Sequence, residues 1–315
     1  MTQERAEASA HGTPPTIPDG ALDLGPGERP TEAREWEQRL RAAGERLLAG
    51  LHGDLLAAWR ATQVTVTQTR PGEPSDQASA VPQIAELEID ATGVRATQQA
   101  LRAVAQISPS APPTGATGEP LTFKRVAVRA LPVDLDGTPV EINGWVENLT
   151  VLTTPDEQGH LWMHTDPGQV LHQLQGRATV TISQENLQAL ARELVSEQIS
   201  AMGATLVDLE VEIDTRDRRS AMVDVAAKVR KGLLSASVRM RVGARVDDQM
   251  MAHLGKIQAR SGNPLVGMIL ATVRGRLDRY AGQEYDLNSY LPAGIRLVDL
   301  SLQADEDLIA DVAFA

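Results

Sequence analysis

The sequence predicts an α+β protein, in which antiparallel strands are combined with a few long amphipathic helices. Strand-like segments follow one another directly over residues 205–245, which is typical of antiparallel pairing and not of strands separated by helices. Their apolar and polar residues alternate strictly, which predicts a sheet with one dry and one wet face. Helical stripes of apolar residues stand before and after these strands, which completes the α+β pattern.

The first predicted helix runs from Thr31 to about Trp59. Thr31 is a favourable N-cap, and acidic residues follow it in the first turn. The apolar stripe of this helix comprises Trp36, Leu40, Ala43, Leu47, Leu51 and Leu55. The stripe fits either packing within the protein or contact with a membrane surface. The mixture of Glu and Arg on the polar face favours packing within the protein, because surface-bound helices are usually uniformly basic.

Residues 1–31 are rich in Pro, Gly, Ala, Thr and acidic residues. This composition offers little apolar surface to bury, so we expect a disordered acidic tail. Deletion of residues 1–30 is expected to leave thermal stability nearly unchanged. We expect residues 32–315 to form a single domain.

Several strands are predicted in the first half of the chain. They cover residues 64–66, 84–91, 123–134, 138–152, 161–164 and 176–182. Asp136-Gly137 stands between two of them and is a strong signal for a two-residue hairpin. A short helix is predicted over residues 97–107.

A second long helix is predicted after Ser183, which is a suitable cap, and Gly203 ends it. Leu187, Leu190 and Leu194 lie on its apolar stripe. Three strands follow, and the last carries Val238, Met240 and Val242 on its apolar side. The first of these strands has an acidic polar row and the third a basic one, so we expect cross-strand ion pairs between them. Residues 247–261 are predicted to be a connection.

A third helix is predicted from Asn263, a good N-cap, with Pro264 at the first helical position. Leu265, Met268, Ile269 and Val273 form its apolar stripe. Beside that stripe, Gly267, Ala271 and Gly275 form a row of small residues, which lets a helix approach its neighbour closely. Two short strands are predicted between this helix and the C-terminus.

Composition excludes several functional classes. The chain has a net charge of −12 and no cysteine, which excludes disulfides and cysteine nucleophiles and argues against a nucleic-acid partner, because phosphate binding needs clustered cations. No apolar run reaches the ~18 residues of a membrane span, and no secretory signal is recognisable. We therefore expect a cytoplasmic protein, with peripheral membrane contact left open.

No catalytic constellation, cofactor motif or metal site is predicted. The chain lacks dinucleotide-binding and P-loop glycine motifs and the serine nucleophile elbow, so we expect a protein that is not an enzyme. His160, His164 and Asp166 share one side of a predicted strand. Polar residues on a hairpin are the favoured interpretation over a metal site, because a strand rarely brings i and i+4 side chains to one ion.

Two segments resemble a known family. The first segment is residues 176–190, where a strand leads into a helix. The second is the closing pair of strands, residues 291–300 and 307–312, which begins with the turn Leu291-Pro-Ala-Gly294. In both segments the chain is similar to the LmeA-like phospholipid-binding family of bacteria. The resemblance implies a TULIP-like fold, in which a long curved antiparallel sheet wraps long amphipathic helices and leaves an apolar groove for phospholipid. Members of this family are usually exported and some support lipid-linked mannan synthesis.

The leading hypothesis is therefore non-enzymatic binding or carriage of a phospholipid or another acyl-chain lipid. The predicted lipid-binding residues are Leu187, Leu190, Leu194, Val238, Met240, Val242, Leu265, Met268, Ile269 and Val273. Burial of acyl methylenes at ~0.8 kcal/mol each would supply the affinity. The alternative is a structural or interaction protein of the same fold with a filled core.

Overall fold

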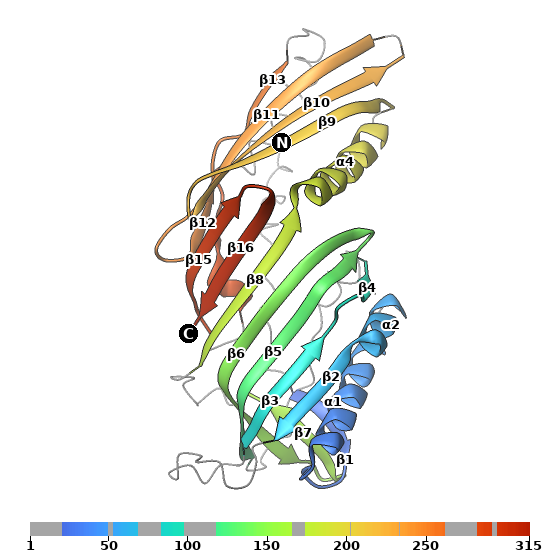
Figure 1. The fold of residues 1–315 in the computed structure, drawn as a ribbon, viewed down its shortest axis with the longest axis vertical. Coiled ribbons are helices and arrows are strands. Elements are labelled where there is room, and N and C mark those ends of the chain that lie inside the picture. Colours follow the sequence, from blue (N-terminus) through green and yellow to red (C-terminus); the bar gives the residue numbers. More distant parts are fainter. Residues whose placement is uncertain are drawn as a thin grey trace, which may run out of the picture.

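The fold comes from a computed structural model that describes residues 21–49, 53–68, 83–97, 118–165, 174–201, 203–232, 234–261, 282–291 and 295–315. Two sheets lie end to end along the long axis of the molecule (Figure 1). Within the described residues, three α-helices accompany them, α1 (Ala33–Leu48), α2 (Gly53–Ala61) and α4 (Gln184–Ala201), together with the short 3-10 helix η1 (Leu287–Tyr290).

The large sheet contains ten strands. They are β1 (Ala21–Pro26), β2 (Gln63–Gln68), β3 (Gln83–Asp90), β4 (Arg95–Ala96), β5 (Glu119–Leu135), β6 (Thr138–Pro155), β7 (His160–His164), β8 (Gln175–Ser183), β15 (Leu297–Ala304) and β16 (Asp307–Phe314). The main path runs β15-β16-β8-β6-β5-β3-β2, and β7 joins β1 to β6. Most pairs are antiparallel, but β3 and β4 each pair in parallel with β5.

The small sheet contains six strands. They are β9 (Thr205–Asp217), β10 (Ser220–Lys231), β11 (Leu234–Val246), β12 (Met251–Leu254), β13 (Gln258–Ser261) and β14 (Glu284–Asp286). The order is β14-β12-β11-β10-β9, with β13 also paired to β11. Helix α4 packs mainly against β9.

The predicted fold class is wrong. Most described residues lie in strands and the three helices are short, so this is a sheet-rich protein and not the α+β, TULIP-like fold with long amphipathic helices. The predicted helix over 31–59 is two helices, α1 and α2. The predicted connection at 247–261 contains β12 and β13, which were missed because each is only four residues long, too short for alternation to be read.

Several local predictions are confirmed. Strands form at each of the six segments predicted in the first half, and Asp136-Gly137 connects β5 to β6 with φ values of 53° and 82°, as a two-residue hairpin of this kind requires. The Ser183 hydroxyl accepts a hydrogen bond from the Asn186 backbone N–H at 3.2 Å, and Gly203 follows α4 with a φ of 70°. The helices predicted over 97–107 and from Asn263 lie almost wholly outside the described residues.

The predicted tail also contains structure, because residues 21–26 form β1. This strand pairs with β7, and its Ala21 and Leu24 side chains are 3% and 2% exposed. Burial of Leu24 against Trp36 and Leu40 of α1 supplies the apolar contact that the composition of the segment did not suggest. Residues 1–20 lie outside the described part of the chain.

Helix α1 closes one edge of the large sheet. Trp36, Leu40 and Ala43 on its inner side are buried in the core beside Val64 and Val66 of β2. Polar side chains of the helix also bond to the backbone at and just before β2. The Glu37 carboxylate accepts from the Val66 backbone N–H at 2.9 Å, and Arg41 donates to the Thr62 carbonyl at 2.7 Å. Glu37 thereby satisfies a backbone group of an edge strand that would otherwise be open to another strand, and Arg41 holds the residue just before that strand.

Candidate functional site

A continuous apolar face crosses the large sheet on the side of α1. Residues paired between neighbouring strands share one face of a sheet, so the register defines rows across β3, β5, β6, β8 and β16. The first row contains Leu87, Val126, Val146, Gly176 and Phe314. The second row contains Ile89, Val128, Gly144, Ala178 and Val312. The third row begins at β5 and contains Ala130, Ile142, Val180 and Ala310, with Leu302 of β15. These three rows are called the inner apolar face below.

The opposite face of the same strands is charged. Arg125 lies between Glu86 and Glu147, at 3.4 Å and 3.3 Å from their carboxylate oxygens, and its guanidinium stacks 5.0 Å from the centre of the Trp145 ring. Arg129 pairs with Glu88 on this face at 3.7 Å. Water therefore contacts the outer face, and the sheet separates it from the inner apolar face.

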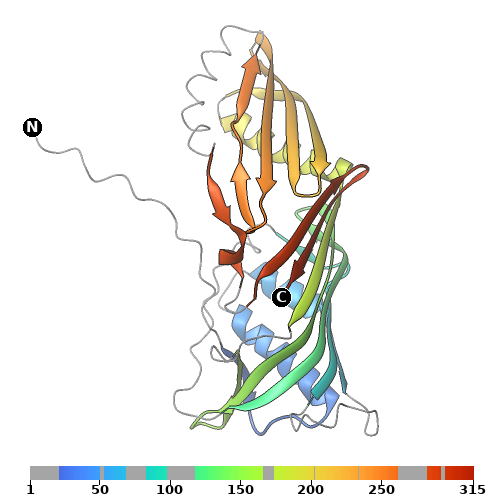
Figure 2. The same cartoon turned by 90° about the vertical axis from the view of Figure 1, so that its left-hand side faces the viewer.

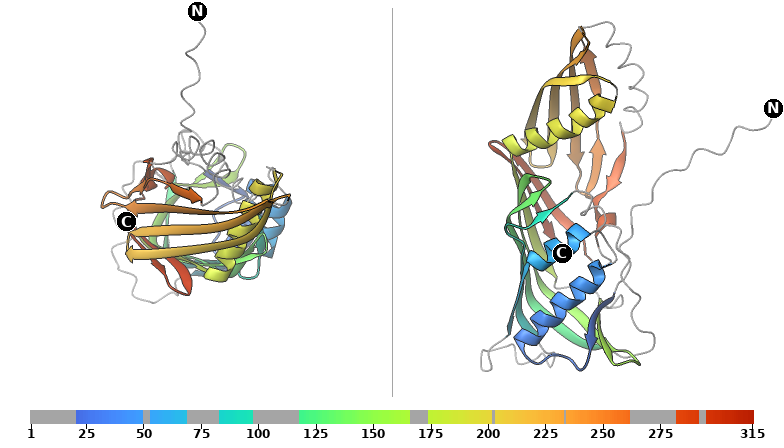
Figure 3. Two further views of the ribbon diagram at one scale, coloured as in Figure 1. Left: turned by 90° about the horizontal axis from the view of Figure 1, so that it is seen from above. Right: turned by 90° about the vertical axis from the view of Figure 1, so that its right-hand side faces the viewer.

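Exposure varies across the inner apolar face: Ala130, Gly144 and Gly176 are buried, while two valines are not. Leu87, next to the edge under α1, is 8% exposed, whereas Val128 and Val180 near the middle of the sheet are 40% and 38% exposed. Figure 2 and the right-hand view of Figure 3 show α1 and α2 on the inner side of the curved large sheet, near its β2 edge. Val128 and Val180 are thus exposed on this face, with half-buried Ile142 and Ala178 in the same rows. Exposed apolar side chains on one sheet face are a candidate binding surface.

The five predicted lipid-binding residues whose side chains the structure describes lie in α4 and the small sheet, away from the inner apolar face. Leu187 and Leu190 are half-buried on α4, while Val238, Met240 and Val242 are half-buried on β11. α4 packs mainly on β9, and β10 separates β9 from β11. Leu187 and Leu190 therefore belong to the helix that packs on β9, whereas the three β11 residues lie two strands away. Leu265, Met268, Ile269, Val273 and the side chain of Leu194 lie outside the described residues.

The expected ion pairs between the acidic and basic rows of the small sheet form in a different way. β9 and β11 are not neighbours, so the acidic row of β9 does not pair directly with the basic row of β11. Arg241 of β11 binds Asp224 of β10 at 2.7 Å, and Asp224 stands opposite Glu212 of β9. The hydrogen bond from Arg241 to Asp224 raises the pKa of the Arg241 guanidinium.

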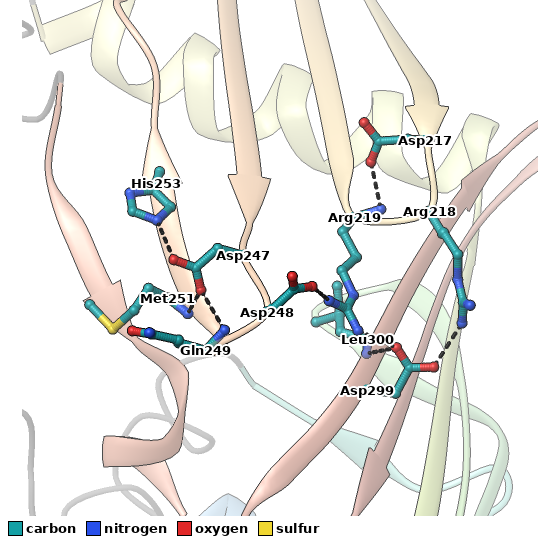
Figure 4. Close-up of polar contacts among 10 residues, drawn as sticks. All are labelled: Asp217, Arg218, Arg219, Asp247, Asp248, Gln249, Met251, His253, Asp299 and Leu300. Carbon is teal, nitrogen blue, oxygen red and sulfur yellow. Dashed lines mark hydrogen bonds and ion pairs between the residues drawn. The ribbon is translucent and has the colours of Figure 1, made fainter.

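A polar junction joins the two sheets (Figure 4). Arg219, in the turn between β9 and β10, donates to Asp299 of β15 at 2.8 Å and to Asp248 at 2.7 Å. The hydrogen bond from Arg219 lowers the pKa of Asp299. Each carboxylate is already engaged by a guanidinium, so this cluster suits a structural contact better than acid–base chemistry.

A second polar group lies beside this junction, in the turn between β11 and β12. The Asp247 carboxylate accepts from the backbone N–H groups of Gln249 and Met251 at 2.8 Å and 3.0 Å, and lies 2.9 Å from Nε2 of His253. The hydrogen bond to Asp247 and the nearby Glu284 carboxylate raise the pKa of His253. Among the described residues, no group of three or more His, Asp or Glu side chains is arranged to hold a metal ion.

The two histidines considered as metal ligands have separate partners. His160 lies 3.3 Å from Asp23 of β1, and His164 lies 3.1 Å from the Thr154 hydroxyl. These contacts fit the interpretation of polar residues on paired strands.

Comparison with protein families, curated proteins and solved structures found no match for this chain. Within the described part of the chain, no helix has the length and apolar character needed to cross a membrane.

Proposed function

We propose that the protein binds a phospholipid or another acyl-chain lipid on the inner apolar face and catalyses no reaction on it. The observation that carries this proposal is the exposure of Val128 and Val180 in the middle of rows that contain only apolar residues and glycine. An acyl chain laid across these rows would remove their surface from water, which stabilises the complex by ~0.8 kcal/mol per methylene buried.

The dimensions of the face suit an extended acyl chain. Neighbouring strands lie ~4.8 Å apart, so the four steps from β5 through β6, β8 and β16 to β15 span roughly 19 Å. β-branched and small residues such as Val128, Gly144 and Ala178 make a shallow wall that a flexible chain can follow. The resemblance to the LmeA-like family points to the same ligand class and stays a prediction.

Native mass spectrometry of the purified protein, followed by organic extraction, tests the proposal directly. We expect copurifying lipid at about one molecule per chain, and uptake of a fluorescent phospholipid by protein from which lipid has been removed. Repeated absence of both would contradict the proposal and favour an interaction protein with a filled core.

Two substitutions test the location of the site. The double variant Val128→Asp and Val180→Asp places carboxylates on the inner apolar face, where an acyl chain would have to desolvate them. Because both valines are more than a third exposed, we expect the variant to fold and to lose lipid uptake. Val298→Asp is the matched control, because Val298 is 50% exposed on β15 and belongs to none of the rows. Equal uptake by the double variant and the control would contradict this site.

A further inference from the structure

The free end of the small sheet combines exposed apolar and cationic side chains. Leu234, where β11 starts, is 63% exposed, the highest value for a large apolar side chain among the described residues. Val207, near the start of β9, is 44% exposed, and its neighbour Leu206 pairs with Val229 of β10. Both therefore lie at the end of the sheet that points away from the large sheet (Figure 1).

Three cations occupy the same end. Lys228, Arg230 and Lys231 are all exposed near the end of strand β10, and Lys231 stands directly opposite Leu234 in the register. Among the described residues, Lys228 and Arg230 form no ion pair. The nearest acidic partner in the register is Asp208, opposite Lys228, and Arg192 of α4 lies 3.4 Å from its carboxylate. We call Val207, Lys228, Arg230, Lys231 and Leu234 the distal tip.

We propose that the distal tip docks on the surface of an anionic lipid bilayer. Leu234 would enter the interface between head groups and acyl chains, while the cations beside it contact lipid phosphates, the division of roles by which peripheral proteins bind membranes. The choice of an anionic bilayer rests on charge complementarity and on the exposed leucine: with a net charge of −12, the chain can approach an anionic surface only where cations such as Lys228 and Arg230 gather. Because the distal tip lies at one end of the long axis, it can contact a bilayer while the rest of the acidic chain stays away from the membrane surface.

Vesicle binding tests this inference with the full chain. Sedimentation would be compared for vesicles of phosphatidylcholine alone and vesicles in which about a third of the lipid is phosphatidylglycerol. We expect binding to the anionic vesicles only, weakening as salt is raised because the exposed charges are screened. Failure to bind anionic vesicles at low salt would overturn the inference.

Variants of the distal tip locate the contact. Leu234→Ser should weaken binding about tenfold, the effect of withdrawing one leucine side chain from an apolar environment. Lys228→Gln combined with Arg230→Gln should weaken it about fivefold for each charge removed.

Matched controls separate the tip from the rest of the protein. Leu47→Ser changes a 37% exposed leucine of α1, and Arg60→Gln with Arg95→Gln removes the same net charge from the region around the large sheet. Both controls should bind like the wild type. An equal loss in the controls and in the tip variants would show that total charge or folding governs binding, and would overturn the inference.

The inference can fail or hold independently of lipid binding in the inner apolar face. The variant carrying Val128→Asp and Val180→Asp retains the whole distal tip, so it should bind anionic vesicles like the wild type. Vesicle binding without lipid uptake by the wild type would support the docking surface and contradict the proposed function. Lipid uptake without vesicle binding would support the proposed function and overturn the docking surface.

Discussion

Arg219 and Asp299 form an ion pair of 2.8 Å between the small sheet and the large sheet. Asp299 also accepts from Arg218 at 2.7 Å. Two backbone groups of β15 also bond to the small sheet: the Leu302 N–H donates to the Arg218 carbonyl in the turn at 2.8 Å, and the Ala304 N–H donates to the Thr215 hydroxyl of β9 at 3.2 Å. The junction therefore satisfies backbone hydrogen-bonding groups of β15, an edge strand of the large sheet, and holds the small sheet against it.

Asp299→Asn should loosen this junction with little loss of overall stability. The amide keeps the shape of the side chain but removes the charge that Arg218 and Arg219 share, so we expect faster hydrogen exchange at the Leu302 and Ala304 amides. The melting temperature should fall by no more than about 3 °C, because exposed ion pairs contribute little. Asp224→Asn is the control, since Asp224 pairs with Arg241 within the small sheet. Unchanged exchange at Leu302 in Asp299→Asn would refute the prediction.

Gly44→Ala should destabilise the protein although alanine favours helices. A Cβ at Gly44 would stand 2.2 Å from the Trp59 ring, which is held by a hydrogen bond from its Nε1 to the Arg41 carbonyl. Overpacking typically costs ~1–3 kcal/mol, which outweighs the gain of up to ~1 kcal/mol in helix propensity.

Gly53→Ala is the matched control for that substitution. Gly53 begins α2, and a Cβ there meets no atom within 4 Å. We expect this variant to be as stable as the wild type or more so by ~0.5–1 kcal/mol. Chemical denaturation of both variants decides the matter, and a Gly44→Ala protein more stable than Gly53→Ala would contradict the close packing of α1 on α2.

His253 should make folding stability depend on pH. Its pKa is raised from the ordinary value of 6.5 by the hydrogen bond to Asp247 and by Glu284, so the folded state binds the proton more tightly than the unfolded state. The resulting stabilisation is fully present below pH 6.5 and is lost as pH rises through the raised pKa. Unfolding measured between pH 6 and pH 8 should show this loss, and His253→Gln should reduce it. An NMR titration of His253 with a pKa at or below 6.5 would refute the prediction.

Leu24→Ala tests whether β1 belongs to the fold. The Leu24 side chain is 2% exposed in the core with Trp36, so its truncation should cost ~2–5 kcal/mol. Leu47→Ala, at a 37% exposed position, should cost much less. The expectation that residues 1–30 can be deleted without loss of thermal stability is accordingly replaced by the prediction of a marked loss once β1 is removed. Equal unfolding midpoints for the two leucine variants would return residues 21–26 to the status of a dispensable tail.

Local signals determined the elements that the sequence predicted well. The hairpin at Asp136-Gly137 needs only two residues that tolerate positive φ, and the cap at Ser183 needs only a hydroxyl before a helical stripe. Both depend on neighbours within a few residues, as do the alternating strands β3 and β9. Short-range requirements of this kind can be recognised from the sequence alone.

The sequence by itself therefore determined that the strands have one apolar and one polar face, because alternation with a period of two is a property of each strand alone. Only the tertiary structure decided which strands align to make the inner apolar face. Val180 pairs with Ile142 on one side and with Ala310 on the other, and no local pattern specifies partners so far apart. α4 lies by β9 and away from β11 for the same physical reason: strand order and register are set by the joint burial of distant segments, which no single segment encodes.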